Sequence, residues 1–95
     1  MLSEIRQLFF KEHFLQLKLL VMRVFIEPKP KARIESAPID HYEIEKDGGN
    51  SVDNKQYLTQ KEAHESAKRQ GYHPVLCARV RVTDKGNPDH WRNCE

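Results

Sequence analysis

The sequence lacks most of the features that reveal a function. It has only two cysteines and four glycines in 95 residues, too few for a disulfide framework or a glycine-rich repeat. The adjacent Gly48 and Gly49 are not followed by the Lys-Ser/Thr step of a phosphate loop, and no serine stands in a nucleophile-elbow context. The 16 basic and 14 acidic residues nearly cancel, which argues against histone-like binding of nucleic acid. Because no catalytic motif is present, we expect a protein that is not an enzyme.

Apolar residues are scarce as well. They make up 38% of the chain, below the roughly 45–50% of ordinary domains, so the core must be thin. A chain of this length is enough for one domain and not for two. We expect modest stability, to which a partner, a second copy or a metal ion could contribute.

Long uninterrupted apolar runs are also absent, and this bears on residues 1–21. The segment is rich in Leu and Phe, but charged residues such as Lys11 and Lys18 interrupt it before it reaches the roughly 20 residues of a bilayer span. It also lacks the cleavage site of a secretory signal. Two interpretations compete: an N-terminal helix that dimerises or lies on a membrane surface, or a non-native leader before a true start at Met22. We expect a cytoplasmic protein with reduced thiols and no integral membrane association.

Residues 22–95 are predicted to form a single small domain. Alternation of apolar and polar residues predicts strands at 23–27 and 41–45. The proline-rich stretch 28–38 is expected to be an extended connector or a sheet edge, because proline cannot donate to a strand ladder. After a turn at the paired glycines, residues 56–58 would form the short return arm of a hairpin.

The segment from Thr59 to Gly71 carries the signals of a surface helix. Thr59 and Glu62 match a capping box, in which the threonine hydroxyl accepts the amide of the glutamate. Gly71 stands where a left-handed C-terminal cap belongs. The apolar stripe consists of Ala63 and Ala67, so the helix is expected to cover the sheet closely while burying little area.

Residues 75–82 alternate as a core strand does. The face predicted to meet the core carries Leu76, Ala78, Val80 and Val82. The opposite face carries Val75, Cys77, Arg79 and Arg81. A function is more expected on this second face, because the helix covers the first.

Together these elements predict an α+β fold. The sheet would be small and antiparallel, with three to four strands, one helix packed on one face and, in addition, the N-terminal helix. The predicted hydrophobic face is formed by Val24, Ile26, Tyr42, Ile44, Leu58, Ala63, Ala67, Leu76, Val80 and Val82.

One functional hypothesis is nucleic-acid binding by an exposed strand face. The residues that would contact phosphates are Arg79, Arg81, Lys29, Lys31 and Arg33. The alternative is that the two strand arginines pair with Glu43 and Glu45 on a neighbouring strand. These ion pairs would neutralise the face and leave it without a binding function.

A second hypothesis is a zinc site. His73 and Cys77 form one pair, and after twelve intervening residues His90 and Cys94 form a second. Two imidazoles with two thiolates suit tetrahedral zinc. Four residues of strand span about 13 Å, however, so His73 and Cys77 can share an ion only if the chain bends between them. We favour a semi-buried thiol and two surface histidines, with no cofactor.

The third hypothesis is a protein-interaction module. Trp91 lies in a polar tail, and tryptophan is enriched among the residues that dominate interfaces; alternatively, it folds back and caps the thin core. We favour a non-enzymatic binding or regulatory protein, of the size and charge common among bacterial and phage accessory proteins. A protein partner or a homodimer is preferred to nucleic acid.

Overall fold

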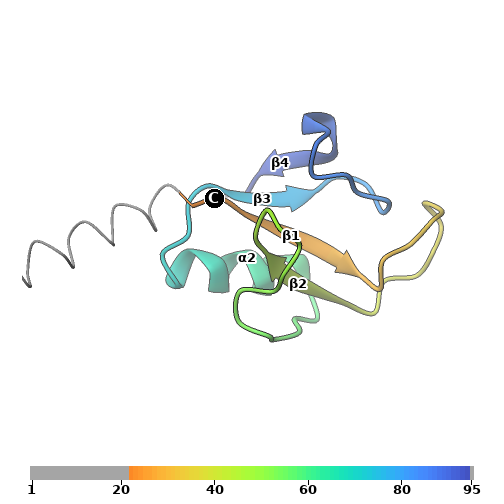
Figure 1. Cartoon of the computed structure of the whole chain (residues 1–95). Coiled ribbons are helices and arrows are strands. Elements are labelled where there is room, and N and C mark those ends of the chain that lie inside the picture. Colours follow the sequence, from red (N-terminus) through yellow and green to blue (C-terminus); the bar gives the residue numbers. More distant parts are fainter. Residues whose placement is uncertain (1–21, 95) are drawn as a thin grey trace, which may run out of the picture.

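A computed structural model of the chain describes residues 22–94 (Figure 1). The elements are β1 (Val24–Lys29), β2 (His41–Glu45), α2 (Gln60–Arg69), β3 (Val75–Ala78), the short 3-10 helix η1 (Pro88–His90) and β4 (Trp91–Asn93). The four strands form one sheet in the order β2-β1-β3-β4, and α2 covers one of its faces. The fold is therefore α+β, as predicted. The expected N-terminal helix falls on residues 1–21 and lies outside the described residues.

The sheet is mixed, and the prediction of an antiparallel sheet is wrong in this respect. β1 pairs with β2 and β3 pairs with β4 in antiparallel fashion, but β1 and β3 run parallel. The chain passes along the outer edge of β2, where Tyr57 bridges to Tyr42, and α2 then returns it to the end at which β1 begins. β3 therefore starts beside Val24 and runs in the same direction as β1.

Proline in the central strand is tolerated because of where it lies. β1 extends beyond its predicted end through Pro28 to Lys29, and these residues pair with β2. The pairing between β1 and β3 involves only Val24 to Ile26. Pro28 thus stands where β1 has one neighbour, so its missing N–H leaves no ladder bond unmade.

The predicted helix signals are confirmed. The Thr59 hydroxyl accepts the amide of Glu62 at 3.1 Å, and Gly71 adopts a φ of +93° just beyond the helix, in the left-handed region that favours glycine. Ala63 and Ala67 are fully buried. Leu58 does not join the core as predicted, because its side chain is 80% exposed.

The face of β3 that meets the core is the reverse of the predicted one. Val75 and Cys77 are fully buried and lie beside Val24 and Ile26 of β1, on the helix side. The strand also ends at Ala78, four residues earlier than expected. Residues 75–78 are apolar on both faces of the strand. Their pattern therefore contains no polar face that would show which side points to solvent.

Five members of the predicted hydrophobic face are fully buried in the structure: Val24, Ile26, Ile44, Ala63 and Ala67. Half-buried Tyr42 and Tyr57 pack against this cluster. Within residues 22–94, no helix has the length and apolar character needed to cross a membrane.

Candidate binding site

The second face of the sheet is covered by the chain that follows β3 and returns to form β4. Phe25 points to this side and is fully buried, although it was not predicted to be in the core. The Trp91 ring packs edge-on against it, with the centroids 4.8 Å apart, and its indole N–H donates to the carbonyl of Asp84. Trp91 is only 7% exposed, so the structure places it in the core and not on a contact surface.

Beside this aromatic pair lies a half-buried network of charged groups. Lys85 Nζ is 2.6 Å from Glu27 Oε2 and 2.7 Å from Glu45 Oε1. The second oxygen of Glu45 lies 2.5 Å from Lys29 Nζ, and the second oxygen of Glu27 accepts the Thr83 hydroxyl. Each carboxylate oxygen therefore has its own donor, which is what buried carboxylates require to remain ionised.

The network shifts the pKa values of Glu45 and Lys85. Burial raises the pKa of Glu45, but hydrogen bonds from Lys29 and Lys85 outweigh burial and hold the pKa below its ordinary value. Burial lowers the pKa of Lys85, and the bonds to Glu27 and Glu45 raise it overall. Both groups are thus charged at neutral pH, and the attraction between them holds the loop after β3 on the sheet.

Arg81 does not lie on an exposed strand face. It is 7% exposed, and its guanidinium donates to the carbonyls of Ala37, Pro30 and Pro38 at 2.6 to 3.0 Å. In return, the Glu35 carboxylate accepts the backbone amides of Arg81 and Val82 at 2.8 and 3.0 Å, and these two bonds lower the pKa of Glu35.

These reciprocal bonds, which we call the Arg81 clamp, fasten the proline-rich loop 30–38 to residues 81–82. The predicted pairing of Arg79 and Arg81 with Glu43 and Glu45 is not formed. Glu45 instead pairs with Lys29 and Lys85, and Glu43 lies 2.7 Å from His41 Nε2. Hydrogen bonds to Asp40 and Glu43 raise the pKa of the His41 imidazole.

The clamp gathers three cations at one end of the sheet. Lys31, Arg33 and Arg79 are exposed, and none of them forms an ion pair with any part of the chain that the structure describes. Lys29, the fourth surface cation expected here, is bound to Glu45. Of the five residues predicted to contact nucleic acid, three are therefore available.

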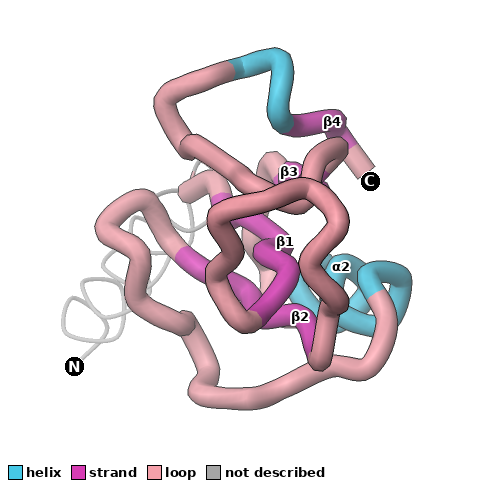
Figure 2. Tube along the Cα trace, turned by 90° about the vertical axis from the view of Figure 1, so that its right-hand side faces the viewer, coloured by secondary structure: helices cyan, strands magenta, loops and turns pink. Residues whose placement is uncertain are grey.

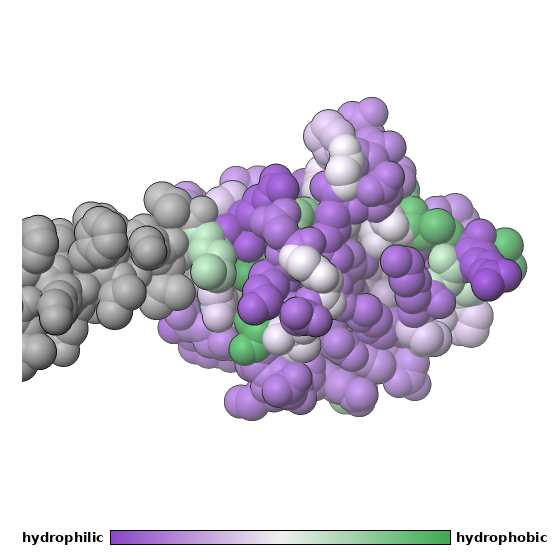
Figure 3. Space-filling model, in the orientation of Figure 1, coloured by the Kyte–Doolittle hydropathy of each residue, from purple (hydrophilic) through white to green (hydrophobic). Residues whose placement is uncertain are grey.

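A shallow groove of about 310 Å³ lies at this end, across the ends of β1, β2 and β3. Figure 2 shows the loops that gather here, facing the viewer. We call it the loop-end groove; it is lined by Ala37, Ile39, Tyr42, Ala78, Arg79 and Val80, among others. Figure 3 shows hydrophobic residues at the same end of an otherwise mainly hydrophilic face.

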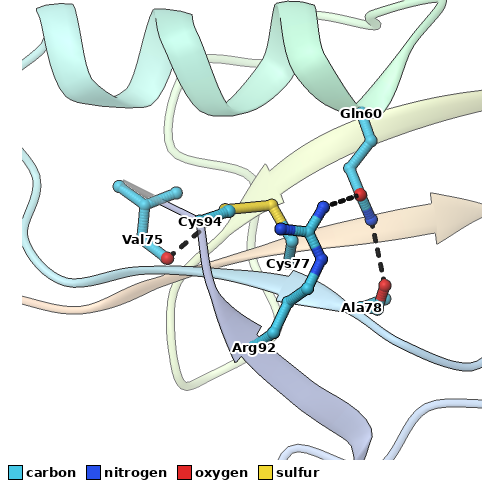
Figure 4. The surroundings of a disulfide bond; sticks show 6 residues. All are labelled: Gln60, Val75, Cys77, Ala78, Arg92 and Cys94. Carbon is cyan, nitrogen blue, oxygen red and sulfur yellow. Dashed lines mark hydrogen bonds between the residues drawn. A yellow bond between two sulfur atoms is a disulfide. The ribbon is translucent and has the colours of Figure 1, made fainter.

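The two cysteines form a disulfide, so the expectation of reduced thiols is wrong. Cys77 in β3 and Cys94 just after β4 are joined, with their Cα atoms 5.8 Å apart (Figure 4). Both sulfurs are then unavailable as the thiolate ligands that the zinc hypothesis needs. His90, the third expected ligand, accepts the Asp84 amide through Nδ1. Across residues 22–94, no group of three or more potential metal ligands is found.

Next to the disulfide, Gln60 connects the helix to the sheet edge. Its side-chain NH2 group donates a hydrogen bond to the carbonyl of Ala78 at 3.0 Å. Its side-chain oxygen accepts a hydrogen bond from Arg92 Nη2 at 2.8 Å (Figure 4). The start of α2 is thereby fixed beside the loop-end groove, which Gln60 also lines.

Several residues that build this end were missed in the sequence. Glu35 lies in an irregular loop and Thr83 and Lys85 lie near a turn, so no periodicity marks them. The available signal was a composition bias: the proline-rich stretch 28–38 carries three basic residues, Lys29, Lys31 and Arg33.

Comparison of the chain with protein-family models, with curated proteins and with solved structures finds no match.

Proposed function

We propose that the protein is a non-enzymatic binding protein whose loop-end groove holds a segment of a partner protein. The partner segment would carry acidic side chains and at least one aliphatic side chain. The observation that supports this proposal is a partly apolar groove lined by the unpaired, exposed cation Arg79. Two further exposed cations, Lys31 and Arg33, lie in the adjacent proline-rich loop. Cations of this kind are complementary to an acidic partner and select against a basic one.

The apolar part of the groove gives the partner something to bury. Ile39 lines it and is 44% exposed, and Ile34, in the same loop, is 61% exposed. Exposed aliphatic side chains surrounded by polar residues are typical of protein contact sites. The Arg81 clamp holds this loop in place before binding, which reduces the ordering cost of association.

Nucleic acid is a second candidate partner, and the same cations favour it. Lys31, Arg33 and Arg79 could each neutralise one phosphate. Stacking platforms for bases are fewer than a single-strand binder normally uses, because Trp91 packs on Phe25 inside the domain. This supports the order of preference given by the sequence, with protein ahead of nucleic acid.

Selection from a displayed peptide library tests the preferred partner class. We expect the enriched peptides to be acidic with an aliphatic residue, and to bind the Arg79→Ala variant about tenfold more weakly, since a charge-assisted hydrogen bond contributes roughly 1.5 kcal/mol. Lys68→Ala is the matched control, because Lys68 is an exposed cation in the last turn of α2. It should bind the peptides as the native protein does.

Two results would count against the proposal: enrichment of basic or uncharged peptides, or equal weakening by Arg79→Ala and Lys68→Ala. Retention of a DNA or RNA oligonucleotide at low salt that falls steeply as salt increases, without any enriched peptide, would favour nucleic acid instead.

A further inference from the structure

A second cavity lies on the other side of the proline-rich loop. Its volume is about 250 Å³, enough for roughly eight water molecules at about 30 Å³ each. Its walls come from β1, the Gly49 turn and the segment that ends at Lys85. Four cationic and two anionic side chains line it: Lys29, Lys31, Arg81, Lys85, Glu27 and Glu45.

The lysines that line the cavity keep unused hydrogen-bond donors. Each oxygen of Glu27 and Glu45 already accepts a bond, from Thr83, Lys85 or Lys29. An ammonium group has three N–H donors, so Lys85 keeps one donor and Lys29 keeps two after these contacts. The cavity therefore has spare positive charge and spare donors.

Arg81 contributes a buried positive charge to the wall of the cavity. Its Nε and Nη2 bind loop carbonyls, whereas Nη1 is buried and has no hydrogen-bond partner. The Glu35 carboxylate lies near this charge, but it accepts the backbone amides of residues 81 and 82 and forms no ion pair with the guanidinium. A buried guanidinium is normally paired; within residues 22–94 this one forms no ion pair, so its charge adds to the excess of cations at the cavity.

We propose that this cavity binds a tetrahedral oxyanion of the phosphate class, either free or as a terminal phosphate monoester. Such an anion presents several acceptor oxygens to convergent donors and balances the excess of cations. Lys31, which is exposed and unpaired at the cavity, donates to the oxyanion from the solvent side. The groove and the cavity share Pro28 and Arg81, but Arg79 lines the groove and not the cavity, whereas Lys31 lines the cavity and not the groove. Variants of Arg79 and Lys31 therefore distinguish the two sites.

The test uses the full chain labelled with ¹⁵N and titrated at low ionic strength, with inorganic phosphate in one arm and phosphoserine in another. Sodium chloride at the same ionic strength gives the baseline. We expect saturable shifts of the Gly49, Thr83 and Lys85 amides beyond that baseline, in at least one arm. Lys31→Met should weaken this binding about tenfold.

Arg33→Met is the matched control, because Arg33 is an exposed cation of the same loop that does not line the cavity. It should leave the affinity within about twofold. Shifts that rise linearly and match those in chloride would overturn the proposal, as would equal losses in Lys31→Met and Arg33→Met. Saturation by phosphate assigns a free anion, and saturation by phosphoserine alone assigns a monoester. The Arg79→Ala variant should bind either probe normally, so failure of the partner proposal would not affect this result.

Discussion

The Lys85→Met variant is expected to lose about 3 kcal/mol of unfolding free energy at neutral pH. Methionine keeps the packing of the side-chain stem but removes the ammonium that two carboxylates share. Breaking a buried ion pair by removing one partner typically costs about 3–5 kcal/mol. The lower figure applies because Glu45 retains Lys29 and Lys85 itself is partly exposed.

The loss should depend on pH in a defined direction. The folded-state pKa of Glu45 is lowered, so its contribution to stability is present above the unfolded pKa and is lost as pH falls through the folded one. The folded-state pKa of Lys85 is raised. Its contribution to stability is therefore present below the pKa of the unfolded state and is lost as pH rises through the folded-state pKa. In the variant, acid protonates Glu45 and removes a buried charge that Lys85 no longer pairs.

Urea denaturation at neutral pH and at about pH 4 measures this difference. The gap in stability between the native protein and Lys85→Met should shrink at the lower pH. Lys61→Met, at an exposed position of α2, should stay within about 0.5 kcal/mol of the native protein at both. A Lys85→Met loss as small as that of this control would show that the network does not hold the loop on the sheet.

Opening the Cys77–Cys94 disulfide is the second change with a large expected effect. The bridged residues are 17 positions apart, and closing a loop of that length in the unfolded chain contributes about 3 kcal/mol. Reductant should therefore lower the unfolding free energy of the native protein by about that amount. In a small domain with a thin core, this is a large fraction of the total.

The Cys77→Ala/Cys94→Ala double variant serves as the control for this measurement. Its stability should match that of the reduced native protein approximately, and reductant should have no effect on it. Mass spectrometry of the reductant-treated protein shows whether the disulfide has opened. If it has, and the unfolding transition is nevertheless unchanged, the disulfide does not stabilise the fold.

Local features of this fold were predictable from the sequence. The helix between Thr59 and Gly71 is defined by short-range hydrogen bonds and by a positive φ, which depend on residues close together in the chain. β2 was predictable too, because its polar residues occupy one face. The thin apolar stripe of α2 correctly indicated a helix that covers the sheet.

Long-range features were not predictable in the same way. Arg81 resembles a surface residue in sequence, and it is buried only because loop carbonyls about 45 residues away surround its guanidinium. The direction of β3 depends on the path of α2, which returns the chain to the end at which β1 begins. The disulfide requires β4, whose three residues are too few to show a period.

The candidate site in the structure differs from the one predicted from the sequence, because long-range contacts also determine where its side chains lie. The cations expected on a flat strand face are instead distributed around a groove and a cavity, which the Arg81 clamp separates. Lys31, Arg33 and Arg79 remain exposed, Lys29 belongs to the charged network, and Arg81 is a structural residue. Sequence composition identified the segments that carry these cations, and the fold determined which of their side chains are exposed.

The most direct test of the central claim, that the loop-end groove is the contact surface, is an amide shift map of ¹⁵N-labelled protein titrated with a selected peptide. We predict the largest shifts at Ile39, Arg79 and Val80, which line the groove. Shifts concentrated instead on the exposed side of α2, around Lys61 and Lys68, would contradict it.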